Sequence, residues 1–584
     1  MKTLTLICFL LVSIISPGQQ SSWLWGNRIG SSKIVGMGPE EQPKDICTDS
    51  YGNVYILNLV YPTGLLSVDT LIFGDYQTSA QNILLTSFRC DGTYRWTKII
   101  GGAAGSYCNS VQADTLGGIY LFSNLYIYAG TIGHIDTDSS IAGTEQSMHV
   151  IKYDTSGTLQ WIRSPQSDTI SFENAINNSK AIDMHVSKNG IVSLLTRMPP
   201  GAHINSSLVL SQPGTYILQY DRFGNYLSAL PLNFEIRGIG TSYQLSTNMT
   251  RSPNGNIIIS GYRYQTAYET LVIENDTIDA IAFVVSFDSA GTLLWHHEIL
   301  KYDSLYTNGL FLGGASTDAD NSVYLSGIAS HLDTIAGYTV NNPLSPNITA
   351  TPILVKLFAD GTLAWAKNAE VGSSTVGWGV ATTNSTVAIS GYYSGVMHWQ
   401  GANTSTNNIP NQGYNPYIAI FNSQTGAFIM QDTLTSSNGN DEKAIGITVD
   451  KNGSYYVCGT FETNIILPNG TFQAWGDGDI FFAKYGTDDC EFTISVDELN
   501  SKDNFNFILF PNPGNGAFSV QFSNEIKNAK LKITDITGKL VYIEKIADVY
   551  SGQIKFFDIE AARGVYFIQI ENGSFVETKK LMIY

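Results

Sequence analysis

The sequence predicts an all-β protein made of a seven-bladed β-propeller followed by a small C-terminal β-sandwich. Three observations support this fold class. The 584 residues include 55 glycines and 12% aromatic residues but only 14% charged residues, which favours an extensive β-protein over a helical one. One pattern of strands and turns recurs seven times along the chain. The last 75 or so residues contain five or six short runs of alternating polar and apolar side chains.

The N-terminus has the pattern of a signal peptide. Lys2 supplies a positive charge, and residues 4–15 form an apolar run of 12 residues, which is too short to span a bilayer. Ser16 and Gly18 are small residues at the −3 and −1 positions of a cleavage site. We therefore expect a signal peptide at residues 1–18. No later stretch reaches 18 apolar residues, so the sequence predicts no membrane span after signal cleavage.

The seven-fold repeat extends over residues 19–492. Its clearest element is Gly-Thr-x-x-Trp, which has four full copies and three weaker ones. The copies end at Trp96, Trp161, Ser228, Trp295, Trp365, Met430 and Cys490, at intervals of 60 to 70 residues. One unit consists of a strand, an Asn-Gly turn, a strand, an excursion of some 15–20 residues, a strand, an Asp-x-x-Gly turn and a strand. Four strands per unit and seven units predict a β-propeller.

The repeat resembles a seven-bladed family of secreted bacterial proteins with D-x-x-G-N-x-Y and K-x-D-x-x-G-x-x-x-W signatures. The resemblance covers about residues 23–492, although copies 3, 6 and 7 lack the tryptophan. Residues 25–30 (WGNRIG) resemble the run WTKIIGG that begins at Trp96. The mature chain therefore begins with a lone fourth strand, which we expect to pair into the last blade and to remove its exposed edge. The tryptophans are expected to pack between neighbouring blades.

The repeated aspartates are interpreted as turn formers rather than as catalytic carboxylates. They recur at equivalent turns of successive units, where an aspartate side chain accepts hydrogen bonds from nearby backbone N–H groups. These residues are Asp49, Asp114, Asp154, Asp221, Asp288, Asp360 and Asp450.

The last 78 residues, 507–584, form a separate predicted domain after a linker at 493–506. Pro511, Asn512 and Pro513 fix a rigid turn at its start. Gly538 and Lys539 lie between two runs of β-type alternation and indicate a hairpin. Further strands begin at Gly564-Val565-Tyr566 and follow Lys579-Lys580. This strand content predicts a small β-sandwich.

The order of these motifs resembles the type A C-terminal sorting domain of the bacterial type IX secretion system. The resemblance implies an outer-membrane bacterium of the phylum Bacteroidota and a chain that is recognised by the type IX secretion machinery. It also implies removal of the domain, with a cut expected in residues 495–506, and a cargo that is released or attached to surface lipopolysaccharide. The residues that carry the resemblance are Pro511, Asn512, Pro513, Gly538, Lys539, Gly564, Val565, Tyr566, Lys579 and Lys580.

Charge and cysteine content exclude several classes of function. The net charge of −18 argues against nucleic acid, whose phosphates require a basic surface. The five cysteines of the mature chain show no zinc-binding spacing, and the sequence does not settle how they pair. No nucleotide-binding or hydrolase motif is present in a suitable context, so we expect no cofactor and no metal.

The excursions within the units are expected to form the functional surface, because they vary while the strands repeat. Tyr126, Tyr128, His398 and Trp399 are candidate ligand-contacting aromatics, and the alternative is that they cover blade edges. The sequence thus predicts a secreted or cell-surface, non-catalytic binding or adhesion module for a glycan or a protein. The alternative is a secreted polysaccharide hydrolase or lyase with carboxylates at the axial mouth of the propeller.

Overall fold

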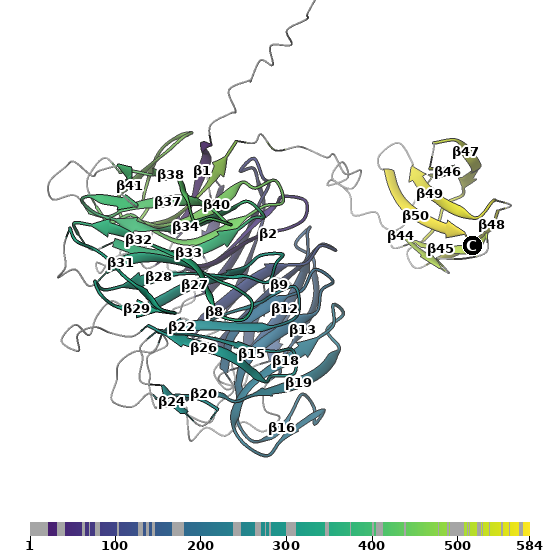
Figure 1. The fold of residues 1–584 in the computed structure, drawn as a ribbon. Helices are drawn as coiled ribbons and strands as arrows, with labels where there is room; N and C mark the ends of the chain where they lie inside the picture. The colour runs from purple at the N-terminus through teal and green to yellow at the C-terminus, as the bar shows by residue number, and fades with distance from the viewer. Residues whose placement is uncertain are drawn as a thin grey trace, which may run out of the picture. The chain divides into compact units, whose positions relative to one another are not determined.

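The computed structural model confirms an all-β protein: the described residues form strands and no helix (Figure 1). The chain divides into an N-terminal unit, Met1–Cys490, and a C-terminal unit, Glu491–Tyr584. The described residues are 21–31, 41–60, 65–68, 71–75, 82–101, 104–126, 132–135, 139–142, 147–165, 180–237, 247–262, 270–274, 276–278, 282–299, 311–344, 350–373, 375–399, 402–403, 413–436, 440–476, 478–487, 490, 507–510, 512, 514, 516–522, 527, 529–536, 538–550, 553–559, 561–571 and 576–583.

The described part of the N-terminal unit contains seven antiparallel four-stranded arrangements, which we call sheets 1 to 7. Sheet 1 contains β2 (Gln42–Thr48), β3 (Val54–Val60), β6 (Asn82–Phe88) and β7 (Tyr94–Gly101). Sheet 2 contains β8 (Ala104–Ala113), β9 (Gly118–Tyr126), β12 (Ser147–Asp154) and β13 (Leu159–Arg163). Sheet 3 contains β14 (Lys180–Val186), β15 (Val192–Met198), β18 (Gly214–Tyr220) and β19 (Tyr226–Leu232). Sheet 4 contains β21 (Thr247–Arg251), β22 (Ile257–Tyr262), β25 (Ala282–Phe287) and β26 (Leu293–Glu298). Sheet 5 contains β27 (Phe311–Thr317), β28 (Val323–Ala329), β31 (Thr351–Leu357) and β32 (Leu363–Val371). Sheet 6 contains β33 (Thr375–Thr382), β34 (Thr386–Tyr393), β37 (Asn415–Asn422) and β38 (Phe428–Thr433). Sheet 7 contains β39 (Lys443–Val449), β40 (Tyr455–Phe461), β43 (Asp479–Gly486) and β1 (Ser22–Ser31).

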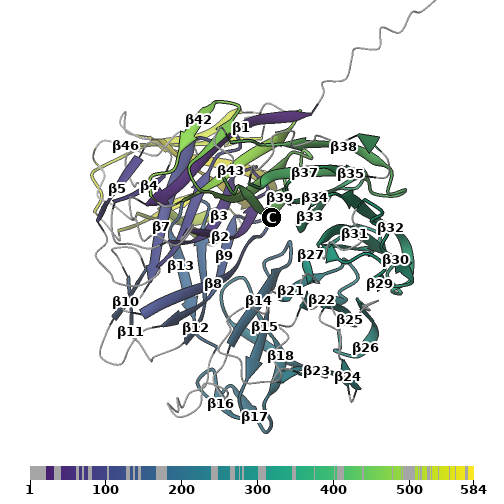
Figure 2. The same cartoon turned by 90° about the vertical axis from the view of Figure 1, so that its left-hand side faces the viewer.

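The first strands of the seven sheets lie side by side in a cyclic order. Each contacts the first strand of the next sheet, and β39 of sheet 7 contacts β2 of sheet 1 (Figure 2). The second and third strands carry most of the core. Both faces of β3, β28 and β40 are buried along their whole length. Such strands must be covered on both sides, which the two neighbouring sheets provide.

Aspartate turns connect the strands, as the sequence predicts. At the β2–β3 turn, one carboxylate oxygen of Asp49 accepts hydrogen bonds from the backbone N–H groups of Tyr51 and Asn53 at 2.8 and 2.9 Å. The same pattern recurs in sheets 2, 3, 4 and 7, at Asp114, Asp154, Asp221, Asp288 and Asp450. Asp360 of sheet 5 instead accepts from the N–H and the hydroxyl of Thr362. These carboxylates are therefore engaged with backbone, which is consistent with their interpretation as turn formers.

The repeated tryptophans join neighbouring sheets. The indole N–H of Trp96 in sheet 1 donates to the carbonyl of Thr155 in the β12–β13 turn of sheet 2, at 2.9 Å. Gly157 of that turn has φ +82°, and a Cβ there would lie 2.8 Å from the Trp96 ring, so only glycine allows this contact. Equivalent indole donors to the next sheet are Trp25, Trp161, Trp295 and Trp365.

The N-terminal strand pairs into the last sheet, as expected. β1 runs antiparallel to β43 from the pair Ser22–Gly486 to the pair Ile29–Ile480. Arg28 forms an ion pair of 2.7 Å with the buried side chain of Asp479. Next to this junction, Cys90 of the β6–β7 turn and Cys490 form a disulfide between residues of sheets 1 and 7.

The seven excursions each contain a β-hairpin. Their strands are β4 (Leu65–Val68) and β5 (Leu71–Asp75), β10 (Ile132–Ile135) and β11 (Ser139–Ala142), β16 (Gly201–His203) and β17 (Leu208–Leu210), β23 (Thr270–Ile273) and β24 (Asp276–Ile278), β29 (Thr334–Ile335) and β30 (Tyr338–Thr339), β35 (Met397–Trp399) and β36 (Ala402–Asn403), and β41 (Asn464–Leu467) and β42 (Gly470–Gln473). Three hairpins pair with the fourth strand of the preceding sheet: β4 with β1, β10 with β7 and β35 with β32. β23 instead pairs with β20 (Phe234–Arg237), which follows sheet 3. Much of the excursion sequence thus covers sheet edges.

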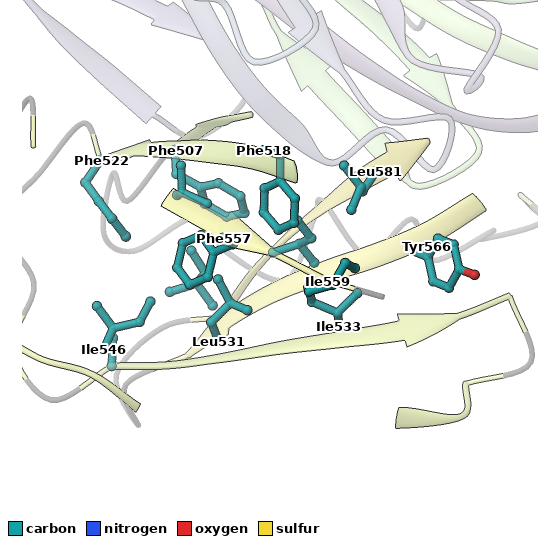
Figure 3. Packing of buried hydrophobic residues seen from close by; sticks show 14 of the residues in the cluster. Phe507, Phe518, Phe522, Leu531, Ile533, Ile546, Phe557, Ile559, Tyr566 and Leu581 are labelled. Atoms are coloured by element: carbon teal, nitrogen blue, oxygen red, sulfur yellow. The ribbon is translucent and has the colours of Figure 1, made fainter. Parts of the chain in front are cut away.

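The C-terminal unit has two sheets around one core. One sheet contains β44 (Phe507–Phe510), β45 (Ala517–Phe522) and β48 (Ile554–Asp558). The other contains β47 (Leu540–Ile546), β46 (Ala529–Asp535), β49 (Gly564–Glu571) and β50 (Val576–Ile583). Side chains from both sheets form a single buried cluster, in which the Phe518 and Phe557 rings stack at 5.5 Å (Figure 3).

Candidate functional site

Asn512 fastens the last strand of the C-terminal unit. Its side-chain N–H donates to the carbonyl of Lys580 at 2.6 Å, and its side-chain oxygen accepts the backbone N–H of Met582 at 2.8 Å. The N–H of Gly514 donates to the carbonyl of Met582 at 2.9 Å. The side chain of Asn512 therefore acts on β50 as a short strand partner would. Pro511 and Pro513 lie outside the described residues.

The Gly538-Lys539 motif forms the β46–β47 turn. Gly538 has φ +83°, and the backbone N–H of Lys539 donates to a carboxylate oxygen of Asp535 at 3.0 Å. Gly564 and Val565 begin β49 opposite the end of β50. Tyr566 is buried, and its hydroxyl donates to the carbonyl of Ala562. These motif residues build the β46–β47 hairpin and the start of the inner strand β49.

The two lysines of the last motif point to opposite faces of that sheet. Lys579 pairs with the buried Ile568, and its ammonium lies 5.6 Å from the centre of the Phe507 ring. Lys580 pairs with Phe567, which is 39% exposed, on the outer face. Lys579 thus covers the core, whereas Lys580 is available to a partner.

Of the four candidate aromatics of the excursions, the structure describes the side chains of His398 and Trp399. Trp399 is fully buried and packs edge-on against Phe421 at 5.0 Å, so the proposal that it contacts a ligand is wrong. It covers the edge of sheet 5 because β35 pairs with β32. His398 is partly exposed on the same hairpin. Tyr126 ends β9 without a described side chain, and Tyr128 lies outside the described residues.

A different set of half-buried aromatics lies at one end of sheets 5 to 7, where their first strands begin. We call it the aromatic cluster; it consists of Phe311, Trp378, Tyr392, Tyr414 and Lys443. The Phe311 and Trp378 rings are 4.8 Å apart, and the Tyr392 and Tyr414 rings are 4.9 Å apart. The ammonium of Lys443 lies 5.7 and 5.4 Å from the two tyrosine rings. Three consecutive sheets thus contribute aromatic faces and a cation to one region.

Acidic groups adjoin the aromatic cluster. Asp441 forms an ion pair of 3.1 Å with Lys443 and accepts the backbone N–H of Tyr414. Burial first, and the charges of Asp441 and Glu462 in addition, raise the pKa of Glu442 to about 8, although a hydrogen bond with Ser436 lowers it. Glu442 is therefore largely protonated at neutral pH. Sequence reasoning missed this cluster because its members come from five strands or strand ends with no common motif.

Two carboxylates on first strands face neighbouring sheets. Asp45 of β2 accepts hydrogen bonds from the hydroxyl of Ser110 and the N–H of Val111 in sheet 2, at 2.9 and 2.8 Å. Asp183 of β14 accepts the N–H of Met249 in sheet 4 at 2.6 Å. Burial raises the pKa of Asp45 to about 6 and that of Asp183 to about 8, although these hydrogen bonds lower both. Each carboxylate links its sheet to the next.

The cysteines outside the disulfide are unreactive in character. Burial raises the pKa of Cys108 and of Cys458 to about 12, and it raises that of Cys47 well above its usual value. Thiols of this kind carry almost no thiolate at neutral pH, so they are poor nucleophiles and metal ligands. In the part of the chain that the structure describes, no group of three His, Cys, Asp or Glu side chains is placed to hold a metal ion.

A family comparison identifies the C-terminal unit. Residues 508–584 match the family model described as the secretion system C-terminal sorting domain. These residues are a type IX secretion sorting domain. The domain directs the protein through the type IX secretion machinery to the outer cell surface or the medium. The match covers only this end of the chain, so it assigns no activity to the N-terminal unit.

No curated protein matches the chain. A protein of unknown function from Dyadobacter fermentans matches with 10% identity and a TM-score of 0.34, over 81% of this chain and 100% of that one. PorZ, a surface component of the type IX secretion system of Porphyromonas gingivalis, matches with 10% identity and a TM-score of 0.24, over 91% of this chain and 74% of that one. TM-scores this low carry no argument about fold or function.

Among the described residues, no helix long and apolar enough to cross a membrane is found.

Proposed function

We propose that the chain is a surface-exported seven-bladed β-propeller that binds a glycan or a protein without catalysing a reaction. In this proposal, residues 1–18 are the signal peptide, 19–492 the propeller, 493–506 the linker and 507–584 a β-sandwich sorting domain. The cyclic order of the seven first strands and the pairing of β1 with β43 support the propeller. The single core shared by two sheets supports the sandwich.

The aromatic cluster is the observation that favours a binding module. Aromatic rings stack on the apolar faces of sugars and of peptide side chains, and a neighbouring lysine and carboxylate supply directional hydrogen bonds. Tyr414, just before β37 of sheet 6, lies next to the ion pair of Lys443 and Asp441, and Trp378 lies on β33 of the same sheet. The aromatic cluster therefore offers both aromatic and charged groups to a ligand.

Binding of the mature protein to an array of bacterial and host glycans tests this proposal. The Trp378→Ala and Tyr414→Ala variants are expected to lose about tenfold or more in affinity for any glycan that the wild-type protein binds. Phe223→Ala is the matched control, because Phe223 is 62% exposed on a turn of sheet 3 and lies outside the cluster. Glycan binding that both cluster variants retain would refute the site.

The alternative of a hydrolase or lyase rests on Asp45 and Asp183. Two carboxylates with raised pKa values are the groups that acid–base cleavage of a polysaccharide requires. Their engagement with backbone N–H groups of neighbouring sheets favours a structural role instead. Release of reducing ends from polysaccharides, abolished by Asp183→Asn, would establish the enzyme. The binding proposal predicts no turnover by either protein.

A further inference from the structure

The C-terminal unit exposes apolar side chains to an extent that its size does not explain. Ten of the twenty large hydrophobic residues that are exposed in the described part of the chain belong to it. A domain with its own closed core does not need these side chains for folding, and contiguous exposed apolar surface marks interaction sites. The position of these residues on the two sheets decides which face is involved.

One face of the four-stranded sheet combines apolar and basic side chains. The strand register places Leu540, Thr534, Phe567 and Lys580 in one row across β47, β46, β49 and β50. Ile543 and Lys532 lie opposite each other two residues along, and Met582 follows Lys580 on β50. We call this the outer face; its members are Lys532, Leu540, Ile543, Phe567, Lys580 and Met582.

The exposure of the outer face is substantial. Leu540 is 49% exposed, Ile543 44%, Phe567 39% and Met582 38%. Between them, Lys532 forms an ion pair of 2.6 Å with Glu571, and Lys580 is exposed beside Phe567. Lys580, on the edge strand β50, places a cation at the margin of this apolar surface, whereas Lys532, on the inner strand β46, is paired with Glu571. Contiguous exposed apolar surface marks an interaction site.

The charge of the domain supports the same interpretation. Residues 507–584 carry nine of the chain's 32 basic residues and eight of its 50 acidic residues. Their net charge is therefore +1, whereas residues 1–506, with 23 basic and 42 acidic residues, have a net charge of −19. A receptor with an apolar centre and carboxylates at its rim would attract this face and repel the cargo.

The motif residues position the outer face. Asn512 holds the backbone of β50 at Lys580 and Met582, and the Gly538 turn sets the start of β47 at Leu540. Both edge strands of the face are thus fixed by residues that do not belong to it. This arrangement explains how a motif with few exposed side chains can specify a recognition surface.

We propose that the outer face docks on an apolar, acidic-rimmed surface of the secretion machinery and is the part of the sorting domain that this machinery reads. The inference rests on the domain's role in export and adds the residues that carry it. The occupant is a protein component of the export system, rather than a second copy of this chain or a lipid surface.

Secretion of the full-length protein by its own cells tests the proposal. The double variant Leu540→Ser, Phe567→Ser and the charge reversal Lys580→Glu are each expected to reduce the secreted fraction about tenfold or more and to accumulate in the periplasm. Phe556→Ser is the matched control, because Phe556 is 84% exposed on the other sheet and should have no effect. Normal secretion of the double variant, or a block caused by Phe556→Ser, would overturn the proposal.

Further measurements separate the explanations. Each purified variant must match the wild type in far-ultraviolet circular dichroism and in protease resistance, which shows that it is folded. If the serine variants misfold, Lys580→Glu still tests the outer face, because Lys580 is exposed. Sedimentation of the wild-type protein as a dimer that Phe567→Ser dissociates would instead assign the face to self-association. Binding of wild type, but not of Phe567→Ser, to vesicles of phosphatidylethanolamine and phosphatidylglycerol would assign it to lipid. If deletion of 507–584 leaves secretion unchanged, it is the sorting role itself that fails.

Discussion

Cys90 and Cys490 form a disulfide that joins the β6–β7 turn of sheet 1 to the residues that follow β43 of sheet 7. Their Cα atoms are 5.8 Å apart, although 400 residues separate them in the sequence. The carbonyl of Cys90 also accepts a hydrogen bond from the indole of Trp25 on β1, at 2.9 Å. A covalent bond and the N-terminal strand therefore fasten the same junction between the first and last sheets.

Replacing Cys90 and Cys490 with serine is expected to lower the free energy of unfolding by about 2–5 kcal/mol, because the crosslink restricts the unfolded chain. Thermal unfolding of the mature protein, with and without a reductant, measures the effect. The reductant should lower the Tm of the wild type and leave that of the double variant unchanged. Cys47→Ser, which removes a thiol outside the disulfide, should respond to the reductant as the wild type does. Equal melting of oxidised and reduced wild-type protein would contradict a stabilising crosslink.

Asn512→Ala is expected to destabilise the C-terminal unit by about 1–3 kcal/mol, because it removes both hydrogen bonds to β50. Asn512→Asp is the matched variant, since it keeps an acceptor for Met582 but cannot donate to Lys580, and its effect should be intermediate. Hydrogen exchange of residues 576–583 in the full-length protein reports the change directly. Equal protection of β50 in all three proteins would show that Asn512 does not hold the strand.

The raised pKa of Asp183 predicts that the free energy of unfolding of the N-terminal unit falls as the pH rises. Burial first, and the charge of Asp45 in addition, raise the pKa of Asp183 from 3.8 to about 8, although hydrogen bonds from Met249 and Met184 lower it. The pKa of Asp183 is higher in the folded state than in the unfolded state. The contribution of this carboxyl group to the free energy of unfolding is therefore fully present below about pH 4 and is lost as the pH rises through 8.

Urea unfolding of the mature protein between pH 4 and 8 measures this dependence. Asp183→Asn keeps an oxygen acceptor for Met249 but does not titrate, so its stability should fall less than that of the wild type. Asp221→Asn, at an exposed turn where hydrogen bonds lower the pKa, should keep the wild-type decline. Parallel pH profiles for wild type and Asp183→Asn would rule out titration of this carboxyl group.

Local sequence motifs predicted the parts of the fold that local chemistry determines. Gly157 and its equivalents have positive φ, which glycine adopts most readily. Where the preceding repeat has the tryptophan, that residue packs on the glycine, as Trp96 does on Gly157. The motif Gly-Thr-x-x-Trp therefore indicates both a turn and a contact between sheets. The pairing of β1 was predictable because Trp25 repeats the pattern of Trp96. The C-terminal motifs were partly informative: Gly538 forms a turn and Gly564 begins β49, as predicted. The prediction that the last strand follows Lys579 and Lys580 was wrong, because both residues lie within β50.

Long-range contacts were beyond the reach of a single sequence. Nothing near Cys90 or Cys490 indicates their pairing, because the cyclic arrangement alone brings them together. The excursions looked like free loops, but three of their hairpins pair with the preceding sheet, and the pairing of β35 with β32 accompanies the burial of Trp399. The aromatic cluster was missed for the same reason, since Trp378 and Tyr414 come from strands without a shared motif.

The central claim is that residues 507–584 are a separate sorting domain, which exports an N-terminal unit that folds by itself and in which β1 pairs with β43. Deletion of residues 507–584 tests this claim most directly. The truncated protein is expected to accumulate in the periplasm, with the Cys90–Cys490 disulfide formed and residues 21–490 as resistant to protease as in the secreted protein. Its appearance at the cell surface or in the medium would contradict the sorting role, and its degradation in the periplasm would contradict the independence of the N-terminal unit.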